Sequence, residues 1–510
     1  MPAKIFSAAV LGLEAVAVEV EADIGGGELG SFSVVGLPDA AISESRERVR
    51  SAIKNSQFDF PRLKVTVNLA PANLKKHGPI YDLPIALSVL TALGKSGLAS
   101  LDLSRSWFLG ELALSGELRP VCGALPIACQ AKDLGIENLF VPEANAKEAG
   151  VIEGIKVFGL KNLRQLINHL IGRELISPQA TKEFNFDIQT ASTDFKEIAG
   201  QQHAKRALTL AAAGNHNILM SGSPGSGKTM LARALPSILP NLSLIEALEL
   251  TKIYSVAGEL SGQKFLVSSR PFRSPHHSAS AVAIVGGGAW PRPGEVSLAH
   301  RGVLFLDEFG EFPRQILESL RQPLEDGVVT VSRAAGSLTF PAKFMLVAAM
   351  NPCPCGFLQD KERPCRCTAS QLTMYRRKLS GPILDRIDLY LDVPRLSFNE
   401  LEKTQDNQSS ADIRRVVVEA RLIQTERFKN TPYIANSEMS SEAVRKFCPL
   451  DNETKHLLEQ AIDRLHLSPR SYFRIIKLSR TIADLSGQEK IAVEHVAEAL
   501  QYRPPTDLLI

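Results

Sequence analysis

The residues with the clearest chemistry follow a short apolar run, Ile218–Met220, that reads as a buried strand. They are Gly222, Ser223, Pro224, Gly225, Ser226, Gly227, Lys228 and Thr229. This stretch fits the phosphate-binding loop G-x-x-x-x-G-K-[ST] at every defined position. Its glycines let the backbone turn several N–H groups toward one anion. Lys228 is placed to reach the β- and γ-phosphates and Thr229 to ligate Mg²⁺, so the sequence predicts a nucleoside triphosphate site.

Two later segments read as strands that end in polar residues. Gly302–Leu306 is followed by Asp307 and Glu308, as in a buried central strand with two carboxylates at its carboxyl end. We expect Asp307 to hold Mg²⁺ through water and Glu308 to polarise the attacking water. Phe344–Met350 is a second such strand, and Asn351 ends it with an amide that can orient water.

Further motifs resemble those of the AAA+ ATPases. Ile198-Ala-Gly-Gln201 before a helix resembles their adenine-contacting segment, and Asn351 occupies the sensor-1 position. The resemblance makes Arg386 an arginine finger, supplied across a subunit interface, and Arg470 a sensor 2 at the start of a helix. For both arginines a surface or structural ion pair is the alternative. Whether Arg470 acts in its own subunit or across the interface stays open.

The chain between Lys228 and Asp307 is longer than a helix, a strand and short loops require. The excess holds Arg270–His277 and Val285–Gly294, and residues 327–340 alternate like a hairpin that turns at Ala335-Gly336. A helix-2 insertion and a hairpin before sensor 1 resemble the AAA+ clade of magnesium chelatase and the MCM helicases.

Together with Met350-Asn-Pro-Cys-Pro-Cys-Gly356 and Ser468-Pro-Arg-Ser-Tyr472, these motifs resemble the YifB/ComM family of magnesium-chelatase-like proteins over essentially the full length. The resemblance implies a hexameric, ATP-fuelled DNA helicase that promotes branch migration during natural transformation. It implies ATP and Mg²⁺ as cofactors and single-stranded or branched DNA as partner. We expect Arg333 and Lys343 to face a pore and to grip phosphates without reading bases.

The N-terminal part carries a second resemblance. His77–Leu87 and Gly110–Gly123 resemble the protease domain of the Lon family, whose fold belongs to the ribosomal S5 domain 2-like group. Lon proteases place their nucleophilic serine where this chain has Ile80, and residues 124–131 contain no lysine to act as base. We therefore expect no peptidase activity, and a domain that docks subunits or contacts a polymer.

These observations predict an α/β chain with four parts. Residues 1–170 form the Lon-like domain, 171–194 a polar linker, 195–395 the AAA+ core with the cysteine cluster 353–367, and 396–510 a helical lid. The predicted lid helices are Asp412–Arg427, Ser441–Cys448, Glu453–Arg464, Ser471–Ser486 and Val493–Tyr502.

Four of the seven cysteines form two C-x-C pairs, Cys353 with Cys355 and Cys365 with Cys367. Four thiolates can surround Zn²⁺ tetrahedrally at ~2.3 Å. Free reduced thiols are the alternative, since C-x-C is a less common zinc spacing. His276 and His277 lack a paired ligand motif, and we expect them to be structural.

Composition bounds the remaining possibilities. A net charge of +3 over 510 residues means that a nucleic-acid surface must be a local patch or pore lining. The cysteine usage fits a reducing cytosol, and no segment reaches the ~18 uninterrupted apolar residues of a membrane span. The apolar run Ile5–Leu13 only faintly resembles a targeting segment, because Glu14 interrupts it. We expect a cytoplasmic protein.

Three other functions were weighed against a DNA motor. A chelatase-type remodeller of a protein partner is the main alternative, and the Lon-like domain argues against it. Ile80 opposes an ATP-dependent protease. A transcription activator of the same clade would carry a Gly-Ala-Phe-Thr-Gly-Ala loop, which the insertion lacks.

Overall fold

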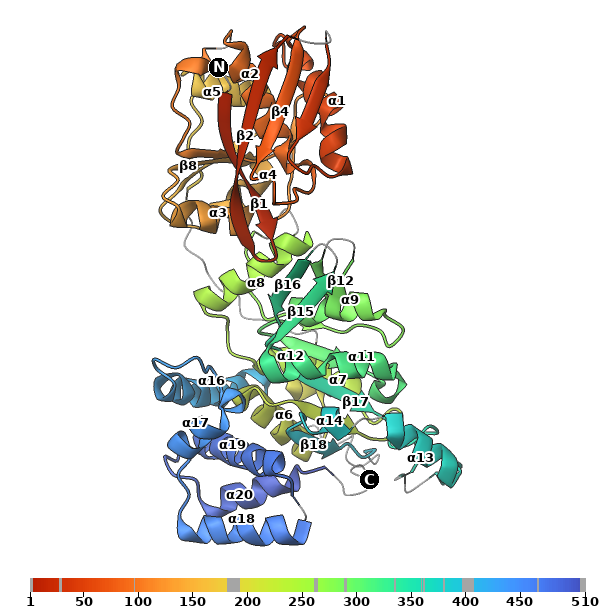
Figure 1. Cartoon of the computed structure of the whole chain (residues 1–510). Coiled ribbons are helices and arrows are strands. Elements are labelled where there is room, and N and C mark those ends of the chain that lie inside the picture. The colour runs from red at the N-terminus through yellow and green to blue at the C-terminus, as the bar shows by residue number, and fades with distance from the viewer. Residues whose placement is uncertain are drawn as a thin grey trace. The chain divides into compact units, whose positions relative to one another are not determined.

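In the computed structural model, the chain divides into two compact units, Met1–Asn185 with Leu244–Val267, and Phe186–Ser243 with Ser268–Ile510. Figure 1 shows their elements. The described residues are 3–26, 30–95, 97–180, 193–260, 265–288, 291–333, 336–358, 360, 363–378, 381–396, 408–465 and 467–504. Helix α8 (Leu244–Ala257), within the range expected for the AAA+ core, belongs to the first of these units.

The first unit is built on a seven-stranded sheet with the order β3-β4-β2-β1-β5-β8-β9. Its strands are β1 (Ala3–Leu11), β2 (Glu14–Gly25), β3 (Phe32–Val35), β4 (Lys64–Ala70), β5 (Ser106–Phe108), β8 (Asn138–Pro142) and β9 (Lys156–Leu160). The pairs β1–β2 and β2–β4 are antiparallel, and the other pairs are parallel. The N-terminal apolar run is thus a central strand, paired with β2 along its whole length.

Helices and a short ribbon complete this unit. They are α1 (Ala40–Asn55), α2 (Asp82–Leu93), α3 (Ala124–Asp133), α4 (Glu143–Ala149), α5 (Leu163–Leu170), α8 (Leu244–Ala257) and the ribbon of β6 (Glu111–Leu112) with β7 (Leu118–Arg119). Helix α2 is buried over most of its length and packs on β1 and β2. Helix α3 packs on β1 and β2 and also contacts α8.

The second unit contains a five-stranded parallel sheet with the order β11-β14-β17-β10-β18. Its strands are β10 (Ile218–Ser221), β11 (Phe272–Arg273), β14 (Val303–Leu306), β17 (Met345–Met350) and β18 (Leu389–Asp392). β14 and β17 are fully buried apolar runs, as expected for parallel strands covered on both faces. All carboxyl ends lie at one edge of this sheet and all amino ends at the opposite edge.

Short helices surround the sheet: α6 (Gln202–Gly214), α7 (Lys228–Ala234), α9 (Ala281–Val285), α10 (Glu295–Leu298), α11 (Arg314–Ser319), α12 (Arg321–Asp326), α13 (Ala369–Lys378) and α14 (Gly381–Leu384). Two antiparallel ribbons occur, β12 (Gly286–Gly287) with β13 (Arg292–Pro293), and β15 (Val328–Arg333) with β16 (Gly336–Pro341). The second ribbon runs from the pair Val328–Pro341 to Arg333–Gly336, which confirms the predicted hairpin. Gly336, which was expected in the turn, is the first residue of β16, and residues 334–335 lie outside the described part of the chain.

The C-terminal region is helical, as predicted, with α16 (Ser410–Arg427), α17 (Ser441–Phe447), α18 (Asn452–Leu465), α19 (Pro469–Leu485) and α20 (Val493–Gln501). Serine caps begin three of these helices, and α16 has a complete capping box with Asp412. Helices α16 and α19 pack on α6, and one apolar core runs from the sheet into these helices. The α/β fold class with a helical C-terminal region is therefore confirmed. Among the described residues, none of the helices is long and apolar enough to cross a membrane.

Candidate nucleotide site and a second pocket across the sheet

The phosphate-binding loop leaves the sheet at the carboxyl end of β10, between β17 and β18. The chain passes to one side of β10 before it adds β18 on the other, and ligands of open α/β sheets bind at such switch points. The Gly222 N–H donates to Met350 O on β17 at 3.3 Å. A Cβ at Gly222 would lie 2.3 Å from Val393 O, so close backbone packing requires glycine here.

Two more glycines of the loop are required by conformation. Gly225 and Gly227 have φ of 79° and 92°, in the left-handed region that side chains disfavour. A Cβ at either position would meet nothing within 4 Å, so backbone torsion and not space selects glycine.

Lys228 and Thr229 open helix α7 and point back to the loop and the sheet edge. Lys228 Nζ donates to Gly222 O at 2.6 Å and to Ser223 O at 3.0 Å, and it lies 3.4 Å from Asn351 Oδ1. Desolvation lowers the pKa of Lys228, although the charge of Asp307 opposes this shift. The structure thus brings together the predicted lysine and the predicted sensor-1 asparagine, which are distant in sequence.

The two carboxylates after β14 have different surroundings. Asp307 Oδ2 accepts the Thr229 hydroxyl at 2.8 Å, and its Oδ1 accepts the Glu308 N–H at 2.9 Å. A hydroxyl oxygen and a carboxylate side by side are the hard donors that Mg²⁺ prefers, so these residues fit the predicted cation. Glu308 has a left-handed backbone, with φ of 51°, and an exposed side chain.

His277 is a neighbour of the site that the sequence analysis did not assign to it. Its Nδ1 lies 3.1 Å from Glu308 Oε2. His276 lies against the His277 ring, with 4.0 Å between ring centroids. The Arg-Ser-Pro-His-His sequence was noted as part of the insertion, yet nothing in its spacing indicated a carboxylate partner. His277 can therefore hold the carboxylate that we expect to polarise water.

The cysteine-bearing loop packs directly on the phosphate-binding loop. A Cβ at Gly356, where φ is 83°, would lie 2.5 Å from Pro224 Cδ. Arg395 donates to Pro224 O at 3.0 Å, and its guanidinium lies over the Phe357 ring. From the other side, Tyr375 donates its hydroxyl to Asn351 O at 3.0 Å. The cysteine-bearing loop therefore supports the glycine turn, and α13, which follows it, supports Asn351.

The four cysteines converge as the paired spacing suggests. Their Sγ atoms all lie within 4.8 Å of one another. Cys353 Sγ is 3.4 Å from Cys355 Sγ and 3.7 Å from Cys365 Sγ. Tetrahedral zinc with Zn–S distances of ~2.3 Å requires S···S separations of roughly 3.8 Å, so the four residues, Cys367 included, fit the ion. The Arg366 N–H lowers the pKa of Cys355 to about 6, which favours a thiolate.

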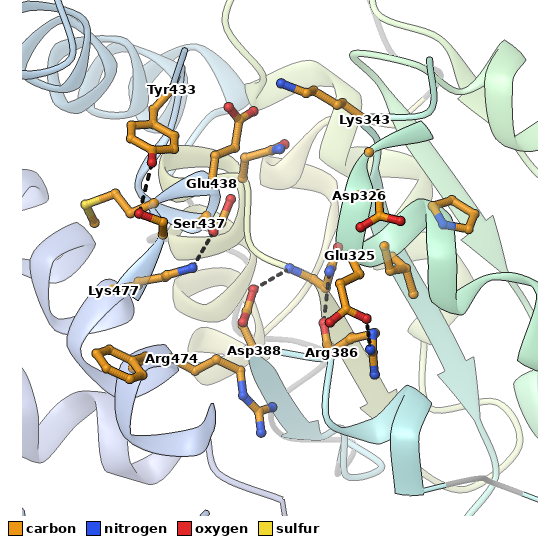
Figure 2. Close-up of a pocket in the computed structure, with 18 of the residues that line it drawn as sticks. Glu325, Asp326, Lys343, Arg386, Asp388, Tyr433, Ser437, Glu438, Arg474 and Lys477 are labelled. Atoms are coloured by element: carbon orange, nitrogen blue, oxygen red, sulfur yellow. Dashed lines mark hydrogen bonds and ion pairs between the residues drawn. The ribbon is translucent and has the colours of Figure 1, made fainter. Parts of the chain in front are cut away.

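The predicted arginines lie elsewhere, in a pocket of about 740 Å³ (Figure 2). Asn217, Phe344 and Asp388, which directly precede β10, β17 and β18, line it. It therefore lies at the amino edge of the sheet, whereas the phosphate-binding loop lies at the carboxyl edge. Arg386 and Arg470 both line this pocket. Asn217 fixes the backbone at Arg386, because its Nδ2 donates to Arg386 O at 2.9 Å.

One carboxylate contacts both arginines. Glu325 Oε2 forms an ion pair with Arg386 Nη2, and Glu325 Oε1 lies 3.6 Å from Arg470 Nη2. Figure 2 shows Glu325 beside Arg386. The surface or structural ion pair weighed for each arginine is thus present, and both pairs share one partner.

The two residues expected to grip DNA have unequal positions. Arg333 ends β15 near the hairpin tip, and its side chain is outside the described part of the structure. Lys343 follows the base of the hairpin and lines the pocket that contains Arg386. The backbones of the two residues therefore lie at opposite ends of the hairpin.

In the first unit, the positions that correspond to a Lon dyad are apolar and packed. Ile80 is 8% exposed. Residues 124–128 at the start of α3 are also buried. The charged neighbour Asp82 is buried and paired with Arg48, with Nε and Oδ2 2.8 Å apart.

Comparison with curated proteins decides the family. Competence protein ComM of Haemophilus influenzae is 44% identical over 511 aligned residues, covering 99% of this chain and 98% of that protein. The chain belongs to the ComM/YifB family. Two proteins called YifB, from Salmonella typhimurium and Escherichia coli, are 42% and 43% identical, each over 99% of this chain and 98% of the relative.

Family models relate this ComM/YifB chain to magnesium chelatase along its length. The model described as "Magnesium chelatase, subunit ChlI" matches residues 194–401, and its C-terminal counterpart matches 407–503. "Subunit ChlI of Mg-chelatase" matches residues 20–145. The 38 kDa magnesium-chelatase subunit of Cereibacter sphaeroides is 29% identical over 31% of this chain and 52% of its own length.

These matches identify a magnesium-chelatase-like AAA+ ATPase, with ATP and Mg²⁺ as its implied cofactors. They also correct one argument from the sequence. The N-terminal part matches a model that is itself named for a chelatase subunit, so its presence does not separate a DNA motor from a chelatase-type remodeller.

Proposed function

We propose that this protein is an ATP-driven DNA motor that works as a homo-oligomeric ring, with six subunits, in branch migration during recombination or natural transformation. The observation that carries the proposal is the separation of the two halves of the ATPase site. Lys228, Thr229 and Asp307 lie at the carboxyl edge of the sheet, and Arg386 and Arg470 line a pocket at its amino edge. β10 spans four residues, about 13 Å of strand, between these edges.

Residues at opposite edges of one sheet complete a site when subunits pack head to tail. A head-to-tail interface closes into a ring when its rotation allows closure. In this arrangement Arg386 and Arg470 of one subunit neutralise charge at the phosphates held by its neighbour. Arg470 then acts across the interface together with Arg386, because both contact Glu325.

Within one subunit, each residue near the phosphate-binding loop has a role that fits its contacts. The loop and Lys228 bind the triphosphate, and Thr229 with Asp307 holds Mg²⁺, which supplies charge neutralisation. Glu308 orients and polarises the attacking water, Asn351 positions it, and His277 keeps the Glu308 carboxylate in place.

DNA as the substrate is supported by the family and by the hairpin. The relative with 44% identity is a competence protein by name. The β15–β16 hairpin leaves the core between α12 and β17, and its strands carry serine and threonine pairs suited to phosphate contacts. Arg333 and Lys343 stay our candidates for charged DNA contacts.

A chelatase-type remodeller of a protein partner is the second candidate. The family models that match residues 20–145, 194–401 and 407–503 all name chelatase subunits, which favours it. It shares the divided ATPase site and differs only in what the motor moves.

We also propose zinc as the ion held by Cys353, Cys355, Cys365 and Cys367. The proposal is supported by the convergence of the four Sγ atoms and by the contact of this loop with Pro224. The ion would hold in place a loop that supports the nucleotide site.

The experiment measures ATP hydrolysis and strand movement on three-stranded and four-stranded branched DNA. We expect DNA to raise the hydrolysis rate, DNA binding to weaken steeply with salt, and strand movement to be lost in Lys228→Ala. ATP turnover that ignores DNA but rises with a protein partner would replace the motor by the remodeller.

A mixture of two inactive variants tests the divided site. Lys228→Ala and Arg386→Ala chains are each expected to be inactive. Mixed rings contain interfaces with one intact lysine and one intact arginine, so an equal mixture should regain about a quarter of wild-type turnover. Mixtures as inactive as their parents would contradict a site that is completed across subunits.

A further inference from the structure

Glu325 lies where the arginine pocket meets the hairpin. It is in the last turn of α12, which ends at Gly327 with a left-handed φ of 67°. β15 begins at the next residue, Val328. Nothing in the sequence motifs pointed to Glu325, because its partners are distant along the chain.

The contacts of Glu325 are those of a bridging anion. Each of its two oxygens faces a different guanidinium, Oε2 facing Arg386 and Oε1 facing Arg470. The hydrogen bond from Arg386 lowers the pKa of Glu325, and the charges of Arg386 and Arg470 add to the shift. Two adjacent cations repel each other unless an anion lies between them. Glu325 therefore offsets the repulsion between these two side chains.

A phosphate would compete for the same groups. Guanidinium groups bind carboxylate and phosphate with the same planar geometry. The Arg386 side chain is 9% exposed and Glu325 is 53% exposed, so the carboxylate is the member of the pair that can leave. The arginines must release Glu325, at least in part, before they can engage an anion on a neighbouring subunit.

The base of the hairpin is fixed to the same segment. The Ala342 N–H donates to Gly327 O at 2.8 Å, which closes the two strands just below β15 and β16. A Cβ at Gly327 would lie 2.8 Å from Lys343 Cγ, so Lys343 packs tightly over this turn. A displacement of the hairpin therefore moves the end of α12, and Glu325 with it.

We propose that Glu325 is a positioning residue that holds Arg386 and Arg470 back from the neighbouring subunit's phosphates until a ligand on the hairpin displaces it. This inference rests on the proposed function, since it assumes that both arginines act across the interface. It adds the step by which substrate on the hairpin accelerates hydrolysis.

The test compares Glu325→Gln with Glu318→Gln in the full-length protein. Glu318 is a matched control because it also lies between two arginines, 4.0 Å from Arg314 and 3.2 Å from Arg321, but outside the pocket. We expect Glu325→Gln to raise the DNA-free kcat about threefold to tenfold. This is the effect expected from the loss of two partly exposed ion pairs. The stimulation by single-stranded DNA should shrink by the same factor.

The KM for ATP distinguishes the loss of this restraint from a general structural defect. It should stay within about twofold of wild type, because the nucleotide loop lies at the other edge of the sheet. Glu325→Asp keeps the charge on a shorter side chain and should give a smaller rise in kcat.

A DNA-free kcat that falls, or that matches Glu318→Gln, would overturn the restraint by Glu325. This outcome is separable from failure of the proposed function. If mixtures of Lys228→Ala and Arg386→Ala chains regain activity while Glu325→Gln leaves kcat unchanged, the divided site stands and only the restraint fails. If the mixtures stay inactive, the proposed function fails first.

Discussion

Each unit of this protein contains a buried lysine whose amino group donates to backbone carbonyls, and the two lysines have different surroundings. Lys76 in the first unit is fully buried, and its Nζ contacts Gly36 O at 3.1 Å, Leu69 O at 2.7 Å and also Pro71 O. Lys228 in the second unit is 8% exposed and donates to two carbonyls of its own glycine loop. Desolvation lowers the pKa of both.

The difference lies in what else each amino group can reach. The partners of Lys76 come from the residue after β3 and from the end of β4 with the residue that follows it, so its role is to join these segments. Lys228 contacts a loop shaped by left-handed glycines, beside Asn351 and near Asp307, and this loop can present the amine to an anion. Burial and a lowered pKa therefore do not distinguish a structural lysine from one expected to bind a ligand. The two differ in whether the surrounding loop can also present the amino group to an anion.

The carboxylates repeat this contrast. Asp82 in the first unit is buried against Arg48 and the Leu112 N–H. Glu148 accepts hydrogen bonds from Leu125 N, Asn145 and Ser255. Asp307 in the second unit has a hydroxyl and an N–H as partners and lies at an open strand end. Asp82 and Glu148 are thus paired in the interior of the first unit, whereas Asp307 lies at a strand end beside Thr229.

The two lysines give the sharpest test of this comparison. Lys228→Ala should lower ATP turnover at least about 100-fold, through loss of charge at the phosphates, with little change in unfolding temperature. Lys76→Met should do the reverse, costing about 3 kcal/mol of stability because the carbonyls lose their donor, with normal turnover per folded molecule. Turnover assays and chemical denaturation measure the two effects. A stable, inactive Lys76→Met protein would contradict the distinction.

Ser255→Ala tests the closed network of the first unit. Ser255 lies on α8, which belongs to the first unit although the chain before and after it belongs to the second. The Ser255 hydroxyl donates to the buried Glu148. Removal of this donor should weaken α8 by about 2 kcal/mol, because a buried carboxylate loses a partner. Hydrogen exchange of the amides in 244–257 measures it, with Ser237→Ala in the second unit as control. Unchanged protection would show that α8 is held by its apolar contacts alone.

The stability that Glu148 contributes to the first unit should also depend on pH. Burial raises the pKa of Glu148, although hydrogen bonds from Ser255, Asn145 and Leu125 N oppose the shift. The folded form therefore binds a proton more readily than the unfolded form, and its stability rises as the pH falls through the folded pKa. Relative to Glu148→Gln, the wild type should gain stability as the pH is lowered from neutral toward the ordinary titration range of glutamate.

The smallest effect is expected at the cysteine cluster. Bound zinc should be found at about one equivalent per chain and lost in Cys353→Ser. Its removal should lower ATP turnover roughly tenfold by loosening the contact of Gly356 with Pro224. Cys448→Ser, at a buried cysteine outside the cluster, is the control. Full activity of a zinc-free protein would limit this loop to a role in folding.

Much of the second unit could be predicted from the sequence because its signals are local. The phosphate-binding loop, the acidic pair after β14, the hairpin and the C-terminal helices each follow from residue types at short spacings. Glycine conformations, strand periodicity and helix caps act within a few residues, so they are visible without the fold. The N-terminal strand β1 was the exception, since a nearly continuous apolar run is ambiguous by periodicity alone.

The tertiary structure decided the associations between distant segments. The position of α8 with the first unit depends on a buried contact between Ser255 and Glu148, which no spacing reveals. The pairing of His277 with Glu308 depends on β11 lying next to β14. The common partner of Arg386 and Arg470 depends on the end of α12, the start of α19 and the segment after α14 coming together in space.

By itself the sequence determined which residues we expect to bind a nucleotide, since a phosphate-binding loop is specified by a run of eight neighbouring residues. Only the tertiary structure decided which of the predicted residues lie beside the phosphate-binding loop of their own chain. Strand order places Lys228 and Asp307 at one edge of the sheet and Arg386 and Arg470 at the other. This order is set by the burial of whole strands against one another, a property of the complete fold that no short motif contains.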